Sequence, residues 1–402
     1  ATIVRIVYFL FNIKNKFLPS LGGDVCYHYN IAYNLASGKG FSVNFIYSYW
    51  NLFDQFPVFA DLYLPGFYLI SSIFLLFSKN YFFVQLFNLL ISFLNIFLSY
   101  YLGKKLRNEN LGIFCAIIVA FNIFHIQHSI IFMTVNFSML LIQLFLISLF
   151  NKKKNFLVLG CVLGFCSISV GGWQALVICC VIFLFFEKEL KNKNILFILL
   201  PFLFFYISWG IVTYLHLGEF RYSMLSLSIF SDGGWLDIIN QIEKPKPIEF
   251  FDIINVEYFW AFFQNIIFNF KKFSEGTLPW LINLPFNTLI FIIITFFSFS
   301  NIEKKKLSIL ILLMILLYLA YTLYLRKDFQ YRYSIIFLPI LSILIGNSLI
   351  NIFNMLFKKK ISLSNKNVVF IVGFLILINC IQIKFYNPFE NRNVKYFYEF
   401  GS

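Results

Sequence analysis

The sequence predicts an all-α protein that crosses a membrane many times, and three observations support this fold class. Of the 402 residues, 60% are hydrophobic, only 12% are charged and 57 are phenylalanine. A soluble domain of this length has too little interior to hide so much apolar surface. The apolar residues form long runs, and the short loops between the runs differ sharply in charge. From these runs we expect about 11 transmembrane helices.

The predicted spans follow from the lengths of the apolar runs, since a helix rises about 1.5 Å per residue across a hydrocarbon core of about 30 Å. Residues 1–13 are too few to cross, and we interpret them as part of a first span, with a cleaved signal peptide as the alternative. The run 155–186 is too long for one crossing, so we divide it at Gly171-Gly172 into a hairpin of two short spans. The other runs are 81–102, 111–127, 130–150, 195–215, 283–300, 307–325, 333–356 and 367–384.

Five short loops are strongly basic and hold 16 of the 32 lysines and arginines but only four acidic residues. Loops rich in lysine and arginine stay in the cytoplasm, so we expect all five there. The net charge of +14 therefore reflects membrane orientation, and we predict no nucleic-acid partner. The basic groups of these loops are Lys104-Lys105-Arg107, Lys152 to Lys154, Lys188-Lys191-Lys193, Lys304 to Lys306, and Lys358 to Lys360 with Lys366.

The apolar segment 63–78 decides on which side Asp24 lies. If this segment crossed the membrane, Asp24 would lie on the cytoplasmic side with the lysines. We therefore predict that Leu62 to Phe77 lies flat or dips back, which places Asp24 in a first external loop, 14–80. The chain then divides into a transmembrane module over 1–215, a large external loop over 216–282, and C-terminal spans with an external tail over 283–402.

Residues 21–69 contain the most informative pattern, GGDVCYHYNIAYNLASGKGF followed by FADLYLPGFYL. Asp24 opens a helical pattern that stops at the Gly38–Gly40 pair. The order D-x-x-Y-x-x-x-x-A…G-x-G, followed by the proline and tyrosine segment, resembles the first external loop of the C-type (GT-C) superfamily of polyprenol-dependent membrane glycosyltransferases. Near the C-terminus, RYSIIFLP resembles the R-Y-x-x-x-x-x-P run with which the family enters a late span. The resemblance covers roughly the first 190 residues and the region of Arg332.

This resemblance implies a GT-C-like fold with juxtamembrane helices in the first external loop, and it implies site residues. Asp24 stands where the family has its catalytic base; the alternative is that it only caps a helix. Arg332, with Tyr333, would hold the phosphate of the lipid carrier; the alternative is an arginine that snorkels at a helix end. Further candidates for substrate or phosphate binding are Asp61, Arg221 and Tyr27.

A divalent metal ion is a weaker expectation. The candidate ligands are Asp24, Asp61 and His28, but HIQHSIIFMTVNFSML, in the second external loop, lacks the acidic residue that relatives often carry there. His125 and His128 could substitute, although a histidine at a membrane interface needs no special function. His28 is one turn after Asp24, and an ordinary position at headgroup level is the simpler interpretation.

The predicted function is transfer of a sugar from a polyprenyl-phosphate donor to a glycan, lipid or protein acceptor. We expect a bacterial cytoplasmic (inner) membrane location, with the active site on the external face. Two other functions stay open. One is a transporter or flippase for a lipid-linked glycan, although ionisable residues are few at mid-membrane positions. The other is a non-catalytic membrane subunit that keeps the GT-C fold.

Overall fold

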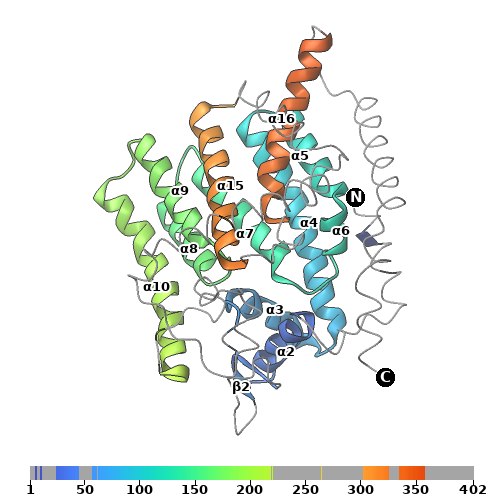
Figure 1. Cartoon of the computed structure of the whole chain (residues 1–402), viewed down its shortest axis with the longest axis vertical. Helices are drawn as coiled ribbons and strands as arrows, with labels where there is room; N and C mark the ends of the chain where they lie inside the picture. The colour runs from blue at the N-terminus through green and yellow to red at the C-terminus, as the bar shows by residue number, and fades with distance from the viewer. Residues whose placement is uncertain are drawn as a thin grey trace.

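The computed structural model is mostly helical and describes residues 5–6, 10, 24–44, 57–60, 62–218, 220, 264, 302–325 and 335–357. Most of its helices run up and down in one bundle, whereas α2 and α3 lie together at one end (Figure 1). The bundle helices are α4 (Tyr81–Leu106), α5 (Glu109–Phe121), α7 (Thr134–Leu149), α8 (Phe156–Ser167), α9 (Trp173–Phe186), α10 (Asn192–Leu217), α15 (Lys304–Leu325) and α16 (Leu338–Phe357), with the short α6 (Ile123–Gln127) between α5 and α7.

Two of the described helices, α4 and α10, are long and apolar enough to cross a membrane, by length and composition. The most apolar window of α10 is only 11% buried, so this helix presents its side chains outward, with Leu215 75% exposed. Such a surface suits lipid and not water. The division predicted within 155–186 is confirmed, since α8 and α9 are separate helices joined through Gly171-Gly172, and their role as two short spans stays a prediction. The count of about 11 spans stays a prediction.

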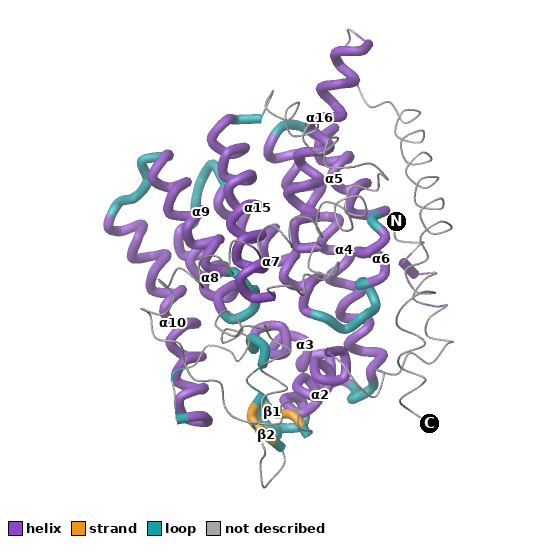
Figure 2. Tube along the Cα trace, viewed as in Figure 1, coloured by secondary structure: helices purple, strands orange, loops and turns teal. Residues whose placement is uncertain are grey.

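The described residues of the predicted first external loop fold into a small lobe at one end of the bundle. It consists of α2 (Asp24–Ala36), α3 (Gly66–Phe77) and two short antiparallel strands, β1 (Ser42–Val43) and β2 (Val58–Phe59), which lie beside α2 (Figure 2). The helix predicted to stop at glycine does so: Gly38, at φ +75°, donates to Leu35 O, and Lys39 N donates to Asn34 O. This pair of bonds is the Schellman motif, which ends helices where glycine permits positive φ.

The apolar segment 62–77 does not form a spanning helix. Its helical part, α3, has 12 residues and so measures about 18 Å, well short of the hydrocarbon thickness. It packs against α2 and the start of α4, and it lies across the bundle axis rather than along it (Figure 1). This agrees with the predicted segment that lies flat. The two strands differ from the all-α prediction, and the fold is therefore mostly helical with one small hairpin.

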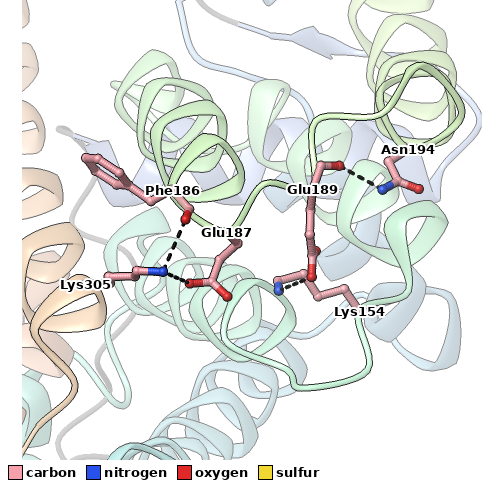
Figure 3. Close-up of polar contacts among 6 residues, drawn as sticks. All are labelled: Lys154, Phe186, Glu187, Glu189, Asn194 and Lys305. Atoms are coloured by element: carbon pink, nitrogen blue, oxygen red, sulfur yellow. Dashed lines mark hydrogen bonds and ion pairs between the residues drawn. The ribbon is translucent and has the colours of Figure 1, made fainter.

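The basic loops within the described residues meet at the opposite end of the bundle. Lys154 Nζ lies 3.1 Å from Glu189 Oε1, and Lys305 Nζ lies 3.2 Å from Glu187 Oε1 (Figure 3). Lys105 donates to the carbonyl of Ile147 in the last turn of α7. Arg107 joins this end to α16 through the side-chain oxygens of Asn347 and Asn351, at 2.6 and 3.0 Å. Four of the five loops predicted to share one side are thus at one end.

Membrane orientation leads to a first testable prediction. Because the small lobe and the basic loops lie at opposite ends, cysteines placed at the exposed residues Asn44 and Lys153 should react with an impermeant thiol reagent from opposite sides. The measurement is labelling of intact and of permeabilised cells, in a Cys161→Ser background because Cys161 is exposed. Labelling of both positions from the same side would contradict the orientation.

Candidate functional site

The candidate site is built around Asp24, the first residue of α2. Its Oδ1 accepts a hydrogen bond of 3.0 Å from the hydroxyl of Tyr63, which precedes α3. Asp24 is half-buried, and it is the only carboxylate within 24–44, 57–60 and 62–80. A carboxylate in the first turn of a helix is stabilised by the helix dipole. Helix position and the Tyr63 contact therefore both hold the carboxylate in place.

A cluster of aromatic side chains surrounds Tyr63, the residue that donates to Asp24. The His28 ring lies 4.7 Å from that of Tyr63, so Asp24 and His28 share the face of α2 that contacts Tyr63, as their spacing predicts. His28 Nδ1 lies 2.5 Å from the hydroxyl of Tyr68 on α3. The ring of Tyr27 meets Tyr63 edge to face at 5.5 Å. These contacts join α2 to the segment LYLPGFYL, whose Tyr63 and Tyr68 were not singled out in the sequence as site residues.

Burial changes the expected roles of two of these residues. His28 and Tyr27 are each only 2% exposed, so neither lies on an open surface. His28 packs inside the lobe, and its interpretation as a headgroup-level histidine stays a prediction. Tyr27 stays a candidate for substrate binding, but in this conformation its ring supports Tyr63. His125, interpreted as an interfacial histidine, is also fully buried.

Two further titratable groups on α2 are kept neutral by their surroundings. Burial, and secondly the nearby Tyr33, raise the pKa of Tyr29, whose hydroxyl donates to the carbonyl of Lys79. Burial also raises the pKa of the Cys26 thiol. A thiol of raised pKa is a poor nucleophile at neutral pH. Neither the hydroxyl of Tyr29 nor the thiol of Cys26 is therefore suited to accept a proton, whereas the carboxylate of Asp24 is.

The lobe is fixed to the bundle at two points. Gly66, the first residue of α3, donates its backbone N–H to the carbonyl of Ile168 at 2.8 Å, in the turn between α8 and α9. On the other side, Phe59 of β2 stacks on His216 at 4.5 Å and on Trp209 at 5.9 Å, both on the last turns of α10. These anchors place Asp24 beneath the end of the bundle at which α10 leads into the predicted loop 216–282.

The remaining predicted site residues lie outside the described residues: Asp61, Arg221, Arg332 and Tyr333. Their roles, and any convergence with Asp24, stay predictions.

A metal site is not formed by the described part of the chain. Within it, no group of three histidine, cysteine, aspartate or glutamate side chains could hold an ion. His28, a candidate ligand, is engaged at Nδ1 by Tyr68 and is shielded by aromatic rings. Of the three candidate ligands, Asp24 is therefore the described one that fits, with Asp61 outside the described residues.

Solved structures with a similar fold share little sequence with this chain. ArnT from Cupriavidus metallidurans bound to undecaprenyl phosphate matches with a TM-score of 0.54 at 11% identity, over 82% of this chain and 56% of that one. The oligosaccharyltransferase of Archaeoglobus fulgidus, in complex with Zn and sulfate, matches with a TM-score of 0.55 at 14% identity, over 94% and 52%. The archaeal oligosaccharyltransferase AglB from Archaeoglobus fulgidus, in complex with an inhibitory peptide and a dolichol-phosphate, matches with a TM-score of 0.51 at 12% identity, over 94% and 54%.

These matches show a shared fold, and this chain spans just over half of the length of the solved chains, 52% and 56% for the two proteins. No protein-family profile matches the sequence. No curated protein matches it either.

Proposed function

We propose that this chain, which has the fold of the C-type membrane glycosyltransferases, transfers a sugar from a polyprenyl-phosphate carrier to an acceptor on the external membrane face. The observation that carries the proposal is the position of Asp24. It is a half-buried carboxylate at the start of α2, held by Tyr63, in a lobe anchored beneath the end of the bundle. Structural relatives solved with undecaprenyl phosphate and with a dolichol-phosphate support the class of carrier.

In the proposed reaction Asp24 is the general base. Its carboxylate takes the proton from the acceptor hydroxyl as the acceptor oxygen forms a bond to the anomeric carbon of the sugar. The bond between that carbon and the phosphate oxygen breaks, and the polyprenyl phosphate leaves with the electron pair. Tyr63 donates a hydrogen bond to one carboxylate oxygen and so fixes the direction of the other. The aromatic packing of Tyr27 and His28 holds Tyr63 in turn.

The leaving phosphate needs a cation, and the proposal assigns this role to Arg332, with Arg221 as the second candidate. A guanidinium can bind phosphate through two parallel hydrogen bonds and stabilise the charge that develops on it. We expect Arg332→Ala to raise the donor concentration needed for half-maximal transfer much more than Arg326→Ala does. Transfer measured against donor concentration in both variants tests this. An unchanged donor requirement in Arg332→Ala would move the role to Arg221.

The experiment that tests the function as a whole begins with the purified protein. Mass spectrometry of the lipid that co-purifies should identify a polyprenyl phosphate, and a radiolabelled polyprenyl-phosphate sugar should lose its label to an acceptor fraction. A divalent ion belongs to this test because one archaeal relative was solved with Zn. Transfer with and without a chelator decides whether Asp24 acts together with a metal.

One observation favours the transport alternative. Arg5 is fully buried between α4 and α5, and it contacts Ser92 in the middle of the long apolar α4. An ionisable group at that depth is common in transporters. Movement of a fluorescent lipid-linked sugar across reconstituted vesicles, without loss of the sugar, would favour transport. A protein that binds the lipid but neither transfers nor moves the sugar would be the non-catalytic subunit.

A further inference from the structure

A line of polar side chains is buried between α4 and α7, deep in the apolar bundle. Its four amides are Asn88 and Asn95 on α4, and Asn136 and Gln143 on α7, and all four are 0% exposed. Within each helix the two amides are seven residues apart, which places them on one face. On α4, Ser92 lies between Asn88 and Asn95, and Ser99 lies one turn after Asn95. We call these six residues the polar seam.

The amide nitrogens of the polar seam all donate to groups that fix their orientation. Asn95 Nδ2 donates to the backbone carbonyl of Asn136 at 2.9 Å, and Asn136 Nδ2 donates to the carbonyl of His128 at 2.7 Å. Gln143 Nε2 donates to the carbonyl of Asn95 at 3.1 Å, and Asn88 Nδ2 donates to the carbonyl of Ile131. Backbone carbonyls only accept, so exchanging nitrogen and oxygen in any of these amides would place two oxygens against each other.

The four amide oxygens consequently point away from those carbonyls, and none has a donor within the described part of the chain. They are Asn88 Oδ1, Asn95 Oδ1, Asn136 Oδ1 and Gln143 Oε1. A buried carbonyl oxygen without a hydrogen bond is destabilising, and native proteins leave only a few such groups unpaired. Four in one seam indicate a missing donor that is not part of the described protein.

A fifth unsatisfied atom, of the opposite polarity, belongs to His125, which is linked to the seam through Arg5. Arg5 donates from Nε to Ser92 Oγ at 2.8 Å and from Nη2 to His125 Nδ1 at 2.7 Å. Because a guanidinium can only donate, His125 Nδ1 is the acceptor of that bond and the ring proton sits on Nε2. Among the described residues, nothing accepts from His125 Nε2.

We propose that the polar seam is a binding site for a short file of ordered water molecules. Water is small, donates to the four amide oxygens, and also accepts from His125 Nε2, whereas a metal cation cannot accept a hydrogen bond. The guanidinium of Arg5 at Ser92, between Asn88 and Asn95, also repels a cation. The water file joins α4 to α7, and it is independent of whether Asp24 is a catalytic base.

An experimental structure of the full chain, at a resolution that shows ordered water, tests the proposal. We expect separate density at hydrogen-bonding distance from the four amide oxygens, those of Asn88, Asn95, Asn136 and Gln143. In a Gln143→Leu structure the density beside Oε1 should disappear while that beside Asn88 remains. The control is Ser342→Ala, whose buried hydroxyl is bonded to Pro339 O in α16, and it should leave the seam density unchanged.

A dry seam in the wild-type structure, with the amide oxygens bonded to protein donors, would overturn the proposal. So would density beside residue 143 that persists after the leucine replacement. Thermal unfolding adds a test against a bound cation. The unfolding temperature should not change when potassium is replaced by sodium or choline at constant ionic strength, and a shift specific to one cation would overturn the assignment to water.

Discussion

Replacing Asp24 with Asn is expected to reduce sugar transfer by about 10²–10⁴-fold, the usual contribution of a general base. The amide keeps the size of the carboxylate and can still accept the hydrogen bond from Tyr63, but it cannot take the proton of the acceptor. Asn also serves helix starts about as well as Asp, so folding should survive. Transfer and thermal unfolding are to be measured on the same preparation.

The controls for Asp24 separate catalysis from folding. Glu109→Gln removes a carboxylate at the opposite end of the bundle, where it lies 3.8 Å from Lys104 on an exposed surface, and it should leave transfer unchanged. If Asp24 only caps α2, Asp24→Asn will be nearly silent, whereas Asp24→Ala will destabilise the protein by about 1 kcal/mol. Normal turnover in Asp24→Asn would remove the general base from the proposed function.

Replacing Gly66 with Ala is expected to destabilise the protein by about 1–3 kcal/mol, as overpacking of a tight contact does. A Cβ at this position would lie 1.8 Å from Ser169 Oγ and 3.0 Å from the carbonyl of Ile168. The close approach lets α3 donate its first N–H to Ile168 O, so the added methyl group pushes the lobe from the bundle. Transfer should fall as well, since the lobe carries Asp24.

A second replacement tests that explanation for Gly66. Two of the three nearest atoms belong to the side chain of Ser169, so Ser169→Gly should recover part of the stability lost in Gly66→Ala. Ser72→Ala, on the same helix with its hydroxyl bonded to Leu69 O, is the matched control and should change the unfolding temperature little. If Gly66→Ala alone leaves the unfolding temperature unchanged, that result would contradict the close contact between α3 and the α8–α9 turn.

The parts of the fold that follow from local signals were predictable from the sequence. The end of α2 was predictable because Gly38 permits the positive φ that a helix stop uses. The α8–α9 hairpin was predictable because a helix over all of 155–186 would exceed the membrane thickness. The positive charge of the basic loops predicted that they lie on one side, and the contacts of Lys154 and Lys305 confirm that their loops share one end of the bundle.

The parts that depend on distant contacts were not predictable. The strands β1 and β2 have two residues each, too short for an alternating pattern to appear. The burial of His28 and His125 was not predictable because a lone histidine carries no sign of the tyrosine or arginine that it meets after folding. The polar seam was missed because single amides spaced seven residues apart hardly lower the hydropathy of an apolar run. The position of Asp24 was predictable from its motif, but its contact with Tyr63 was not.

The stacking of Phe59 on Trp209 and His216 has a mechanical consequence. It couples the strand pair to the last turns of α10, so a tilt of that helix is transmitted to the lobe that holds Asp24. The hydrogen bond from Gly66 to Ile168 O attaches the lobe separately to the α8–α9 turn. We expect the lobe to rotate about this second attachment when α10 tilts. We expect a tilt of α10 to change the direction of the carboxylate without touching it.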